Sequence, residues 1–341
     1  MRVSSYLDSA QELIEFRNLN RDSVRDRAYF DWRYQTRPCV AAPIIVWAEQ
    51  SGRHVGALSV FPHDYHVLDK EYPIGVLGDI SVIEECRGQG VGGAMFQFLA
   101  QLDSIKKLHG CLVLPNEQAA RPLMKAGWNE VQRIGRRVKL LDVSSRIDRW
   151  LGPTLGNMIA WPMNRALELA SFEHLYRRRS TFTAAVLTRF DERFDRLWQN
   201  TDKRGRVIGV RSLAYLRWRY ERHPLNIYKV FALLEGDELH GYAVYRVDGS
   251  VCHVDDIFYR GSEGCVATLL SMLMKRLREE STASSVVVNI NESVFAFPWR
   301  RFGFVRRADF QHVLTADGGA DNALTAARHA GWHVTAGDKD V

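Results

Sequence analysis

The chain has 341 residues, of which 46% are hydrophobic and 25% charged, and these fractions exclude collagen-like, disordered and disulfide-scaffold proteins. Forty-six Lys and Arg against 40 Asp and Glu leave a formal net charge of +6, which favours an anionic ligand but gives no concentrated basic stripe for nucleic acid. The length allows two domains, and five scattered cysteines without a CxxC pair indicate free thiols in a reducing compartment.

The start of the chain and its hydropathy predict a cytoplasmic protein. Glu12, Glu15 and Arg17 interrupt the N-terminal segment before the apolar core of a signal peptide could form. No apolar stretch approaches the roughly 18 residues that a membrane span needs. We therefore expect no membrane insertion.

Two similar segments indicate an internal duplication. Residues 25–38 (RDRAYFDWRYQTRP) and 211–224 (RSLAYLRWRYERHP) share seven of fourteen residues at a shift of 186. Further along, Asp79-Ile80 corresponds to Asp256-Ile257, and Gly127-Trp128 corresponds to Gly303-Phe304. Each copy is predicted to run helix, hairpin, strand, long helix, buried strand, short helix and final strand.

The hydrophobic periods place these elements. In the first copy we expect the long helix at 91–108, the buried strand at 111–114 and the short helix at 118–125. In the second copy the same elements are expected at 264–278, 285–290 and 293–301. The hairpins make each sheet mostly antiparallel.

The predicted organisation has four parts: a first lobe at 1–141, a connecting helical segment at 142–190, a second lobe at 191–315 and a tail at 316–341. Leu167, Leu169 and Leu175 favour an amphipathic connecting helix packed across the two lobes, with contact between 150–163 and a membrane surface as the alternative. The tail is expected to be only partly ordered.

A glycine-rich turn is the most informative segment. An apolar strand leads into Arg87-Gly88-Gln89-Gly90-Val91-Gly92-Gly93, which opens the long helix. Consecutive amides followed by a helix N-terminus form an anion site suited to phosphate or pyrophosphate. The turn lacks the Gly-Lys-Ser/Thr of a P-loop. Gly88, Gly90 and Gly93 match GxGxxG, but an antiparallel sheet and an acidic residue, Asp103, inside the same helix do not fit a dinucleotide-binding fold.

The pattern R-x-x-G-x-G at Arg87–Gly92 resembles the acetyl-CoA loop of the GNAT superfamily of N-acyltransferases. Asn116, a short helix and Lys125-Ala126-Gly127-Trp128 resemble that family's asparagine–helix–glycine–aromatic segment. The resemblance covers 78–128 in motifs and both copies in element order. It implies a tandem-duplicated α/β (α+β) protein with two GNAT-like lobes, each a mixed, mostly antiparallel sheet flanked by helices.

The resemblance also implies acetyl-CoA as co-substrate. Backbone amides of the loop would hold the pyrophosphate, at Arg87, Gly88, Gln89, Gly90, Val91, Gly92 and Gly93. Main-chain groups of Ile80, Ser81 and Val82 would bind pantetheine and polarise the thioester carbonyl, and Asn116 would flank the pantetheine arm. His63 and His66 lack further ligands at metal spacing, so no metal is expected.

Attack by an amine on the thioester needs a base and an acid. Asp79 is the candidate base, with a pKa raised by an apolar setting, and the alternative is a carboxylate paired with a nearby arginine. Ser81 is a candidate for orienting a water molecule. The family often has a tyrosine acid where this chain has Leu123, which leaves the acid to water or to the other lobe.

The second copy has lost the glycine loop, because Arg260–Cys265 lacks the double glycine. We therefore expect a degenerate lobe that walls the acceptor cleft, with His253, Asp255 and Asp256 as substrate-binding candidates. The alternative for each is a strand residue with satisfied hydrogen bonds.

The expected reaction is N-acetylation of a primary amine on a small molecule. A loose resemblance to bacterial acyltransferases of envelope polysaccharide pathways favours an amino sugar or sugar nucleotide as acceptor. Two alternatives stay open: an aminoacyl or peptide N-acyltransferase, and a non-catalytic CoA-binding sensor or scaffold, which Leu123 favours. No nucleic-acid partner is expected, and the sequence leaves the oligomeric state open.

Overall fold

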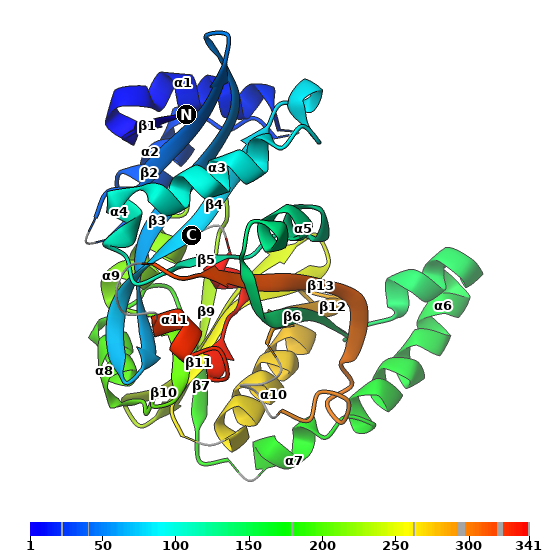
Figure 1. Cartoon of the computed structure of the whole chain (residues 1–341). Helices are drawn as coiled ribbons and strands as arrows, with labels where there is room; N and C mark the ends of the chain where they lie inside the picture. The colour runs from blue at the N-terminus through cyan, green and yellow to red at the C-terminus, as the bar shows by residue number, and fades with distance from the viewer. Residues whose placement is uncertain are drawn as a thin grey trace.

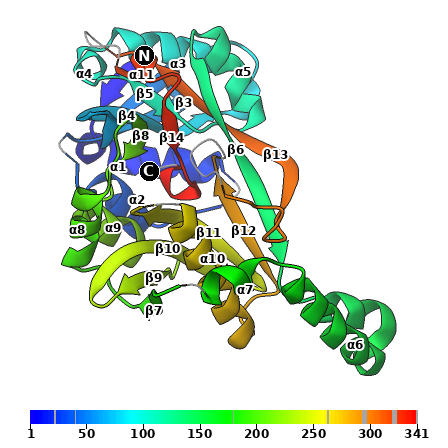
Figure 2. The ribbon, with the colours of Figure 1, turned by 90° about the horizontal axis from the view of Figure 1, so that it is seen from below.

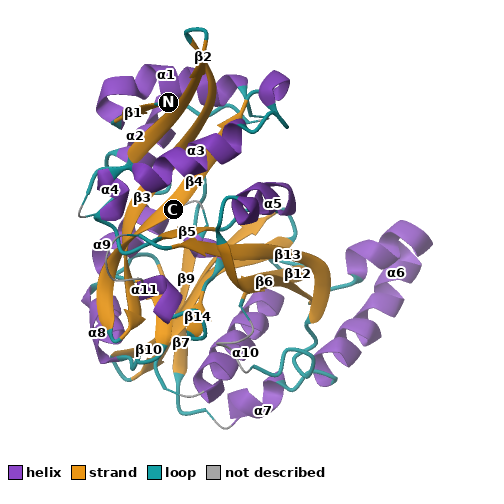
Figure 3. Ribbon diagram, viewed as in Figure 1, coloured by secondary structure: helices purple, strands orange, loops and turns teal. Residues whose placement is uncertain are grey.

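Within the described part of the chain, fourteen strands form one mixed sheet that runs through both halves of the molecule, with helices on its faces (Figure 1 and Figure 3). The computed structural model describes residues 1–21, 23–39, 41–178, 180–261, 263–291, 297–318 and 323–339. Most neighbouring strands are antiparallel, and the parallel pairs are β4 with β5, β11 with β12, and β8 with β14. This confirms the predicted α/β fold with a mostly antiparallel sheet.

The first copy contains the elements β1 (Arg2–Ser4), α1 (Tyr6–Leu19), α2 (Arg27–Tyr34), β2 (Ile44–Gln50), β3 (Arg53–Leu68), β4 (Lys70–Val82), a 3₁₀ turn (Glu84–Cys86), α3 (Val91–Gln101), α4 (Asp103–Lys106), β5 (Cys111–Val113), α5 (Glu117–Lys125) and β6 (Asn129–Leu140). The predicted helix at 91–108 is thus two helices, because Leu102 has extended backbone angles.

The rest of the chain contains α6 (Ser144–Leu169), α7 (Glu173–Arg178), β7 (Thr183–Leu187), α8 (Glu192–Asn200), β8 (Arg206–Gly209), α9 (Leu213–Leu216), a π-helical turn (Arg217–Glu221), β9 (Lys229–Glu235), β10 (Glu238–Asp248), β11 (Val251–Tyr259), α10 (Glu263–Glu279), β12 (Ser285–Ile290), β13 (Val305–Ala316), α11 (Ala323–Ala326), β14 (Gly331–His333) and a 3₁₀ turn (Ala336–Asp338). The predicted helix at 264–278 and strand at 285–290 are α10 and β12. Residues 293–296 of the short helix predicted at 293–301 lie outside the described residues, and the prediction is wrong for 297–301, which form no helix.

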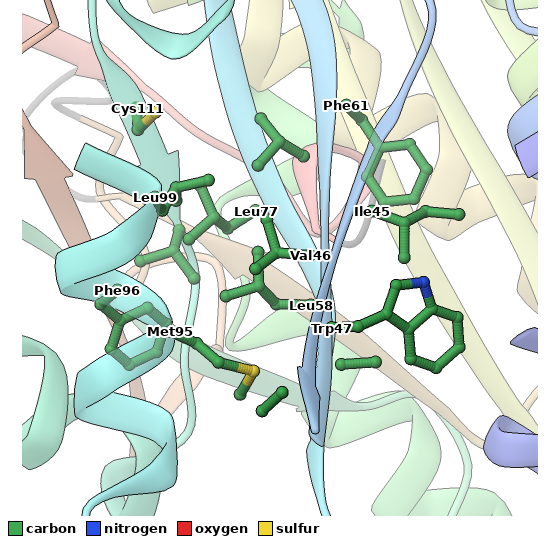
Figure 4. Packing of buried hydrophobic residues seen from close by; sticks show 14 of the residues in the cluster. Ile45, Val46, Trp47, Leu58, Phe61, Leu77, Met95, Phe96, Leu99 and Cys111 are labelled. Atoms are coloured by element: carbon green, nitrogen blue, oxygen red, sulfur yellow. The ribbon is translucent and has the colours of Figure 1, made fainter. Parts of the chain in front are cut away.

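The core of the first copy lies on both sides of its strands. Met95, Phe96 and Leu99 point from α3 toward one side of the sheet, whereas Phe61 and Trp47 lie on the opposite side (Figure 4). Each of these side chains is at most 6% exposed. The i, i+1, i+4 spacing of these three residues gives α3 an apolar face. This face packs α3 against the sheet.

The two copies exchange their last strands. β6 ends the first copy in sequence but pairs with β12 of the second, and β13 ends the second copy but pairs with β5 of the first. β6 and β13 also pair with each other, so they join the two copies into one sheet. In addition, β7 pairs with β9 as β1 pairs with β2, although β7 lies within the segment predicted as a connector.

The connecting segment is helical, as expected, but its packing differs from the expectation. α6 projects from the body of the molecule (Figure 1 and Figure 2) instead of lying across the two lobes. Trp150 is 86% exposed, Trp161 75% and Met158 72%. Gly152, with a φ of 76°, interrupts the helix, so a single amphipathic stripe cannot run along it. None of the helices in the described ranges has the length and hydropathy of a membrane span.

The expectation of a partly ordered tail is wrong for residues 323–339. Trp332 is fully buried and Val334 is 1% exposed, and β14 pairs with β8. Figure 2 shows this segment between the strands of the first copy and those of the second. The C-terminal segment is therefore part of the core that joins the copies.

Candidate functional site

The strands of the first copy separate where the site residues begin. β4 and β5 pair in parallel from Gly75 with Cys111 to Leu77 with Val113, and the pairing ends there. Ile80, Ser81 and Val82 continue β4 beyond this point, where they pair only with β3 on their other side. Their main-chain groups on the β5 side therefore face an opening in the described part of the sheet, as the predicted pantetheine site requires.

A bulge in β4 lies at this opening. The register with β3 shifts between Ala57 and Ser59, so that Asp79 and Ile80 together lie opposite one residue. Asp79 has a φ of 54°, in the left-handed region that few residues other than glycine adopt without strain. The bulge turns this peptide out of the regular ladder at the point where the strands diverge.

The glycine loop is open to solvent. Arg87, Gly88, Gln89 and Gly90 are exposed, and Gly88 and Gly90 have φ values of 76° and 84°. A Cβ atom built on Gly88, Gly90, Gly92 or Gly93 would meet no other atom within 4 Å. Space for a ligand therefore lies directly against the backbone of the loop.

The amides of the loop divide into two groups. Arg87 N donates to Glu84 O at 3.1 Å, and Gln89 N donates to Cys86 O at 3.4 Å, so these two amides contribute to the turn itself. Val91, Gly92 and Gly93 form the first turn of α3, where a helix has no carbonyl four residues back for its amides. The helix dipole adds positive potential there. The first turn of α3 thus carries the anion-binding capacity.

Asp79 is held by basic and hydroxyl groups from α2. Arg33 Nε donates to Asp79 Oδ2 at 2.9 Å, and the Tyr34 hydroxyl donates to the same oxygen at 2.7 Å. Arg21 Nη2 lies 3.5 Å from the other oxygen, Oδ1. Burial alone would raise the pKa of Asp79, but Arg33, Arg17 and Arg21 together hold that pKa well below its usual range.

The expectation of a raised pKa for Asp79 is therefore wrong, and the alternative, a carboxylate paired with arginine, describes the structure. Arg33 and Tyr34 belong to the Trp-Arg-Tyr block that is repeated at 218–220, which is a sequence signal for a structural role. Nothing in the sequence indicates that Arg17 and Arg21 lie near Asp79.

The second predicted motif has a structural explanation in part. Asn116 Oδ1 accepts a hydrogen bond from Ala119 N at 2.9 Å and so caps the N-terminus of α5. Leu123 is fully buried in the first core, and Trp128 packs edge-on against Phe96. Leu123 therefore faces the core, where a tyrosine hydroxyl would need a polar partner. Asn116 stays a candidate for the pantetheine arm.

The substrate candidates of the second copy separate into two environments. Asp256 is 1% exposed, and Arg211 lies 3.3 Å from it in an ion pair. His253 and Asp255 are partly exposed on the other face of β11, and Arg246 Nε donates to Asp255 Oδ2 at 3.2 Å. Asp256 is thus a buried structural group, whereas His253 and Asp255 remain available as candidates.

The bulge itself is present in the second copy too. The register of β11 with β10 shifts next to Asp255, and the C-terminal segment fills the space beside it. Thr335 Oγ1 donates to Asp256 Oδ1 at 3.1 Å, and Arg219 Nε donates to Gly337 O at 3.2 Å. The second copy therefore keeps a register shift next to its aspartate but not the positive φ of Asp79, and the C-terminal segment lies beside the aspartate.

No group of three or more His, Cys, Asp or Glu side chains within the described ranges is arranged to hold a metal ion. The first copy offers an anion site, an open strand edge and an ionised carboxylate.

Known proteins resemble this chain in part of its sequence and in its fold. Residues 8–128 match the acetyltransferase (GNAT) family. No curated protein matches the chain. Among solved structures, a GCN5-related N-acetyltransferase from Anabaena variabilis is 13% identical, with a TM-score of 0.63, 92% of this chain covered and 72% of the other.

Two further structures have the same fold. A protein from Enterococcus faecalis described as a probable N-acyltransferase is 10% identical, with a TM-score of 0.63 and coverage of 93% and 72%. An N-myristoyltransferase from Saccharomyces cerevisiae, solved with myristoyl-CoA, is 11% identical, with a TM-score of 0.54 and coverage of 94% and 80%.

The family match covers residues 8–128, which lie in the first copy, and the solved structures share the fold of this chain.

Proposed function

We propose that the protein transfers an acetyl group from acetyl-CoA to a primary amine, and that the first copy carries the reaction. The observation that carries this proposal is the opening between β4 and β5 beside the glycine-lined first turn of α3. The amides of Val91, Gly92 and Gly93, with Gly88 and Gly90, bind the pyrophosphate. The exposed Arg87 and Gln89 complete the loop.

The thioester lies at the opening in this proposal. Main-chain groups of Ile80, Ser81 and Val82 on the β5 side hold pantetheine and polarise the thioester carbonyl. Asn116, at the N-terminus of α5, flanks the arm. The attacking amine must lose a proton, and the leaving thiolate must gain one.

Asp79 takes a specific part in this scheme. Its carboxylate is ionised, and Oδ1 faces Arg21 at 3.5 Å, which is longer than a hydrogen bond and leaves this oxygen able to accept one from the incoming ammonium. A carboxylate with a lowered pKa is a weak base, so in this proposal a water molecule oriented by Ser81 relays the proton from the amine to bulk solvent. His253 and Asp255 contribute to the acceptor side from the second copy.

For the acceptor we propose an amino sugar or sugar nucleotide of envelope polysaccharide metabolism, and the duplicated layout supports this choice. Two other functions compete: an aminoacyl or peptide N-acyltransferase, and a CoA-binding sensor, which the buried Leu123 supports because no tyrosine acid is present there.

The test is calorimetry with CoA and acetyl-CoA, followed by turnover on a panel of amines with acyl donors of increasing chain length. Gly90→Trp should abolish CoA binding, because a side chain there strains a φ of 84° and fills the loop. Gly236→Trp is the matched control, since Gly236 has a φ of 59° in an open turn between β9 and β10.

Three results separate the functions. Turnover of an amine with the wild type and the control, and none with Gly90→Trp, supports the proposal. Tight CoA binding without turnover of any amine supports the sensor. A well-folded wild type that gives no heat with CoA contradicts both.

A further inference from the structure

The buried face of the first copy next to the β4 bulge holds more positive than negative charge. We call Asp79, Arg17, Arg21, Arg33 and Tyr34 the Asp79 cluster. It contains three arginines and one carboxylate. Arg33 and Arg21 approach the two oxygens of Asp79 at 2.9 and 3.5 Å. One carboxylate cannot pair with three guanidinium groups, so the cluster carries excess positive charge.

Arg17 is a buried cation of the Asp79 cluster, and its side chain donates no hydrogen bond to the described residues. Its residue is 2% exposed, and its Nε, Nη1 and Nη2 have no hydrogen-bond partner among the described residues. Burial lowers the pKa of Arg17, the Asp79 carboxylate opposes that change, and Arg21 and Arg33 add to it. Five buried donors on one charged group are costly to leave without acceptors. The Arg17 guanidinium therefore offers donors that suit an acceptor-rich anion.

The second copy shows how arginines near its aspartate, Asp256, find acceptors. Arg211 pairs with Asp256 and also with Asp338 of the C-terminal segment at 2.8 Å. Arg219, which corresponds to Arg33, donates to carbonyl groups of the same segment. In the second copy, the chain thus places a second carboxylate, Asp338, beside Asp256, and both carboxylates pair with Arg211.

The counterpart of Arg17 is also satisfied. At the shift of 186 it is Lys203, whose Nζ donates to Thr201 O at 2.9 Å and to Trp198 O at 2.5 Å. Arg17 lies inside the last turn of α1, whereas Lys203 follows the end of α8, and Arg17 makes no such contacts with the described residues. Lys203 therefore has backbone acceptors, whereas the Arg17 side chain has no acceptor among the described residues.

We propose that the amine acceptor carries an anionic group, a phosphate or a carboxylate, which binds Arg17 and Arg21 beside Asp79. This inference rests on the proposed function and narrows its substrate class. The amine of the acceptor then lies near the strand opening, where Asp79 Oδ1 accepts a hydrogen bond from the ammonium. Both a sugar phosphate and an amino acid satisfy this chemistry.

Matched pairs of amines distinguish the two sources of the anion. Glucosamine 6-phosphate is compared with glucosamine, and β-alanine is compared with β-alaninamide, at constant ionic strength. We expect one anionic member to have a KM about 10- to 100-fold lower than its neutral partner, since hydrogen bonds to charged groups are of that strength. The pair that shows the difference names the anion.

Arg17→Met should remove this preference and raise the KM for the anionic acceptor about 10-fold or more, with kcat and the affinity for CoA little changed. Arg17→Lys should restore part of the preference, because it keeps the charge but loses the forked geometry. Arg204→Met, whose side chain is 85% exposed, is the matched control and should change neither constant.

A readout without turnover tests the site independently. Inorganic phosphate should raise the Tm of the wild type relative to chloride at equal ionic strength, and it should not raise the Tm of Arg17→Met. Without ligand, Arg17→Met should melt at or above the wild-type Tm, because it removes a buried charge that lacks acceptors.

Equal KM values within both amine pairs, or no phosphate effect on Tm, would overturn this inference. A large fall in the ligand-free Tm of Arg17→Met would also overturn it, since Arg17 would then be a structural group. Failure of the wild type to bind CoA instead contradicts the proposed function, and the phosphate measurement still decides the anion site.

Discussion

Trp32 and Trp218 stack with their ring centroids 4.9 Å apart and an interplanar angle of 15°. Each indole N–H donates to the backbone carbonyl of the other residue, at 2.9 Å from Trp32 and 2.8 Å from Trp218. The two residues are 186 positions apart, which is the shift that aligns the two copies. A reciprocal contact between corresponding residues places them on a pseudo-two-fold axis that relates the copies.

This pair should couple the stabilities of the two copies. Trp218→Phe keeps a ring but leaves the buried Trp32 carbonyl without its donor, so the free energy of unfolding should fall by about 1–3 kcal/mol. A cycle with Trp32→Phe should show a coupling of about 0.5–1.5 kcal/mol. Urea unfolding measures both quantities. Strict additivity of the two substitutions would mean that the contact contributes nothing of its own.

The sequence predicts much of this arrangement because two segments, 25–38 and 211–224, repeat rare residues at the same spacing. Trp32, Trp218 and the glycines of 88–93 indicate the copies, the helix start and the loop without reference to distant contacts. The exchange of β6 and β13 is different. A hydrophobic strand pattern shows which face is buried but not which neighbour pairs with it.

Properties that depend on contacts between distant residues could not be predicted from the sequence. The pKa of Asp79 is set by Arg33, Arg17 and Arg21, which lie 46 to 62 positions earlier in the chain. Burial and charge oppose each other there, so its direction requires the contacts. Likewise, Trp332 in a glycine-flanked tail gives no periodic pattern, although its pairing with β8 buries it.

Removing the charge of Asp79 should be strongly destabilising. Asp79→Asn leaves Arg33 in a buried site without its counter-charge, and the free energy of unfolding should fall by about 3–5 kcal/mol. Because the folded pKa lies below the unfolded value, the wild-type contribution is present above about pH 4 and is lost as the pH falls below it.

Denaturation of Asp79→Asn across pH 2 to 8 checks this assignment, with Asp237→Asn on the exposed turn after β9 as the control. The difference between wild type and Asp79→Asn should be constant at neutral pH and shrink in acid. A kcat/KM profile with an ionisation between pH 5 and 8 that vanishes in Asp79→Asn would instead make Asp79 a base with a raised pKa.

His333 should make the protein sensitive to mild acid. Burial, with Arg211 nearby, lowers the pKa of His333 to about 3, so the folded protein keeps this ring neutral while the unfolded chain protonates it near pH 6.5. The unfolded state thus binds more protons below that pH, and stability should fall by up to about 1.4 kcal/mol per pH unit.

The measurement is urea unfolding of wild type and His333→Gln between pH 7 and 4.5. The substitution should lower stability at pH 7 but flatten the slope in acid, whereas His329→Gln, at an exposed position, should leave the slope unchanged. Parallel slopes for wild type and His333→Gln would contradict a neutral buried ring.

Two tryptophans outside the repeat should respond in opposite ways to truncation. Trp332 is fully buried against β8, and its indole N–H donates to Ala327 O at 3.1 Å, so Trp332→Ala should cost about 3–5 kcal/mol of unfolding free energy. Trp150 on the projecting α6 is 86% exposed, and Trp150→Ala should change the free energy of unfolding by less than about 0.5 kcal/mol. Equal losses would show that α6 packs against the body in solution, and two small losses would show that the C-terminal segment is not part of the core.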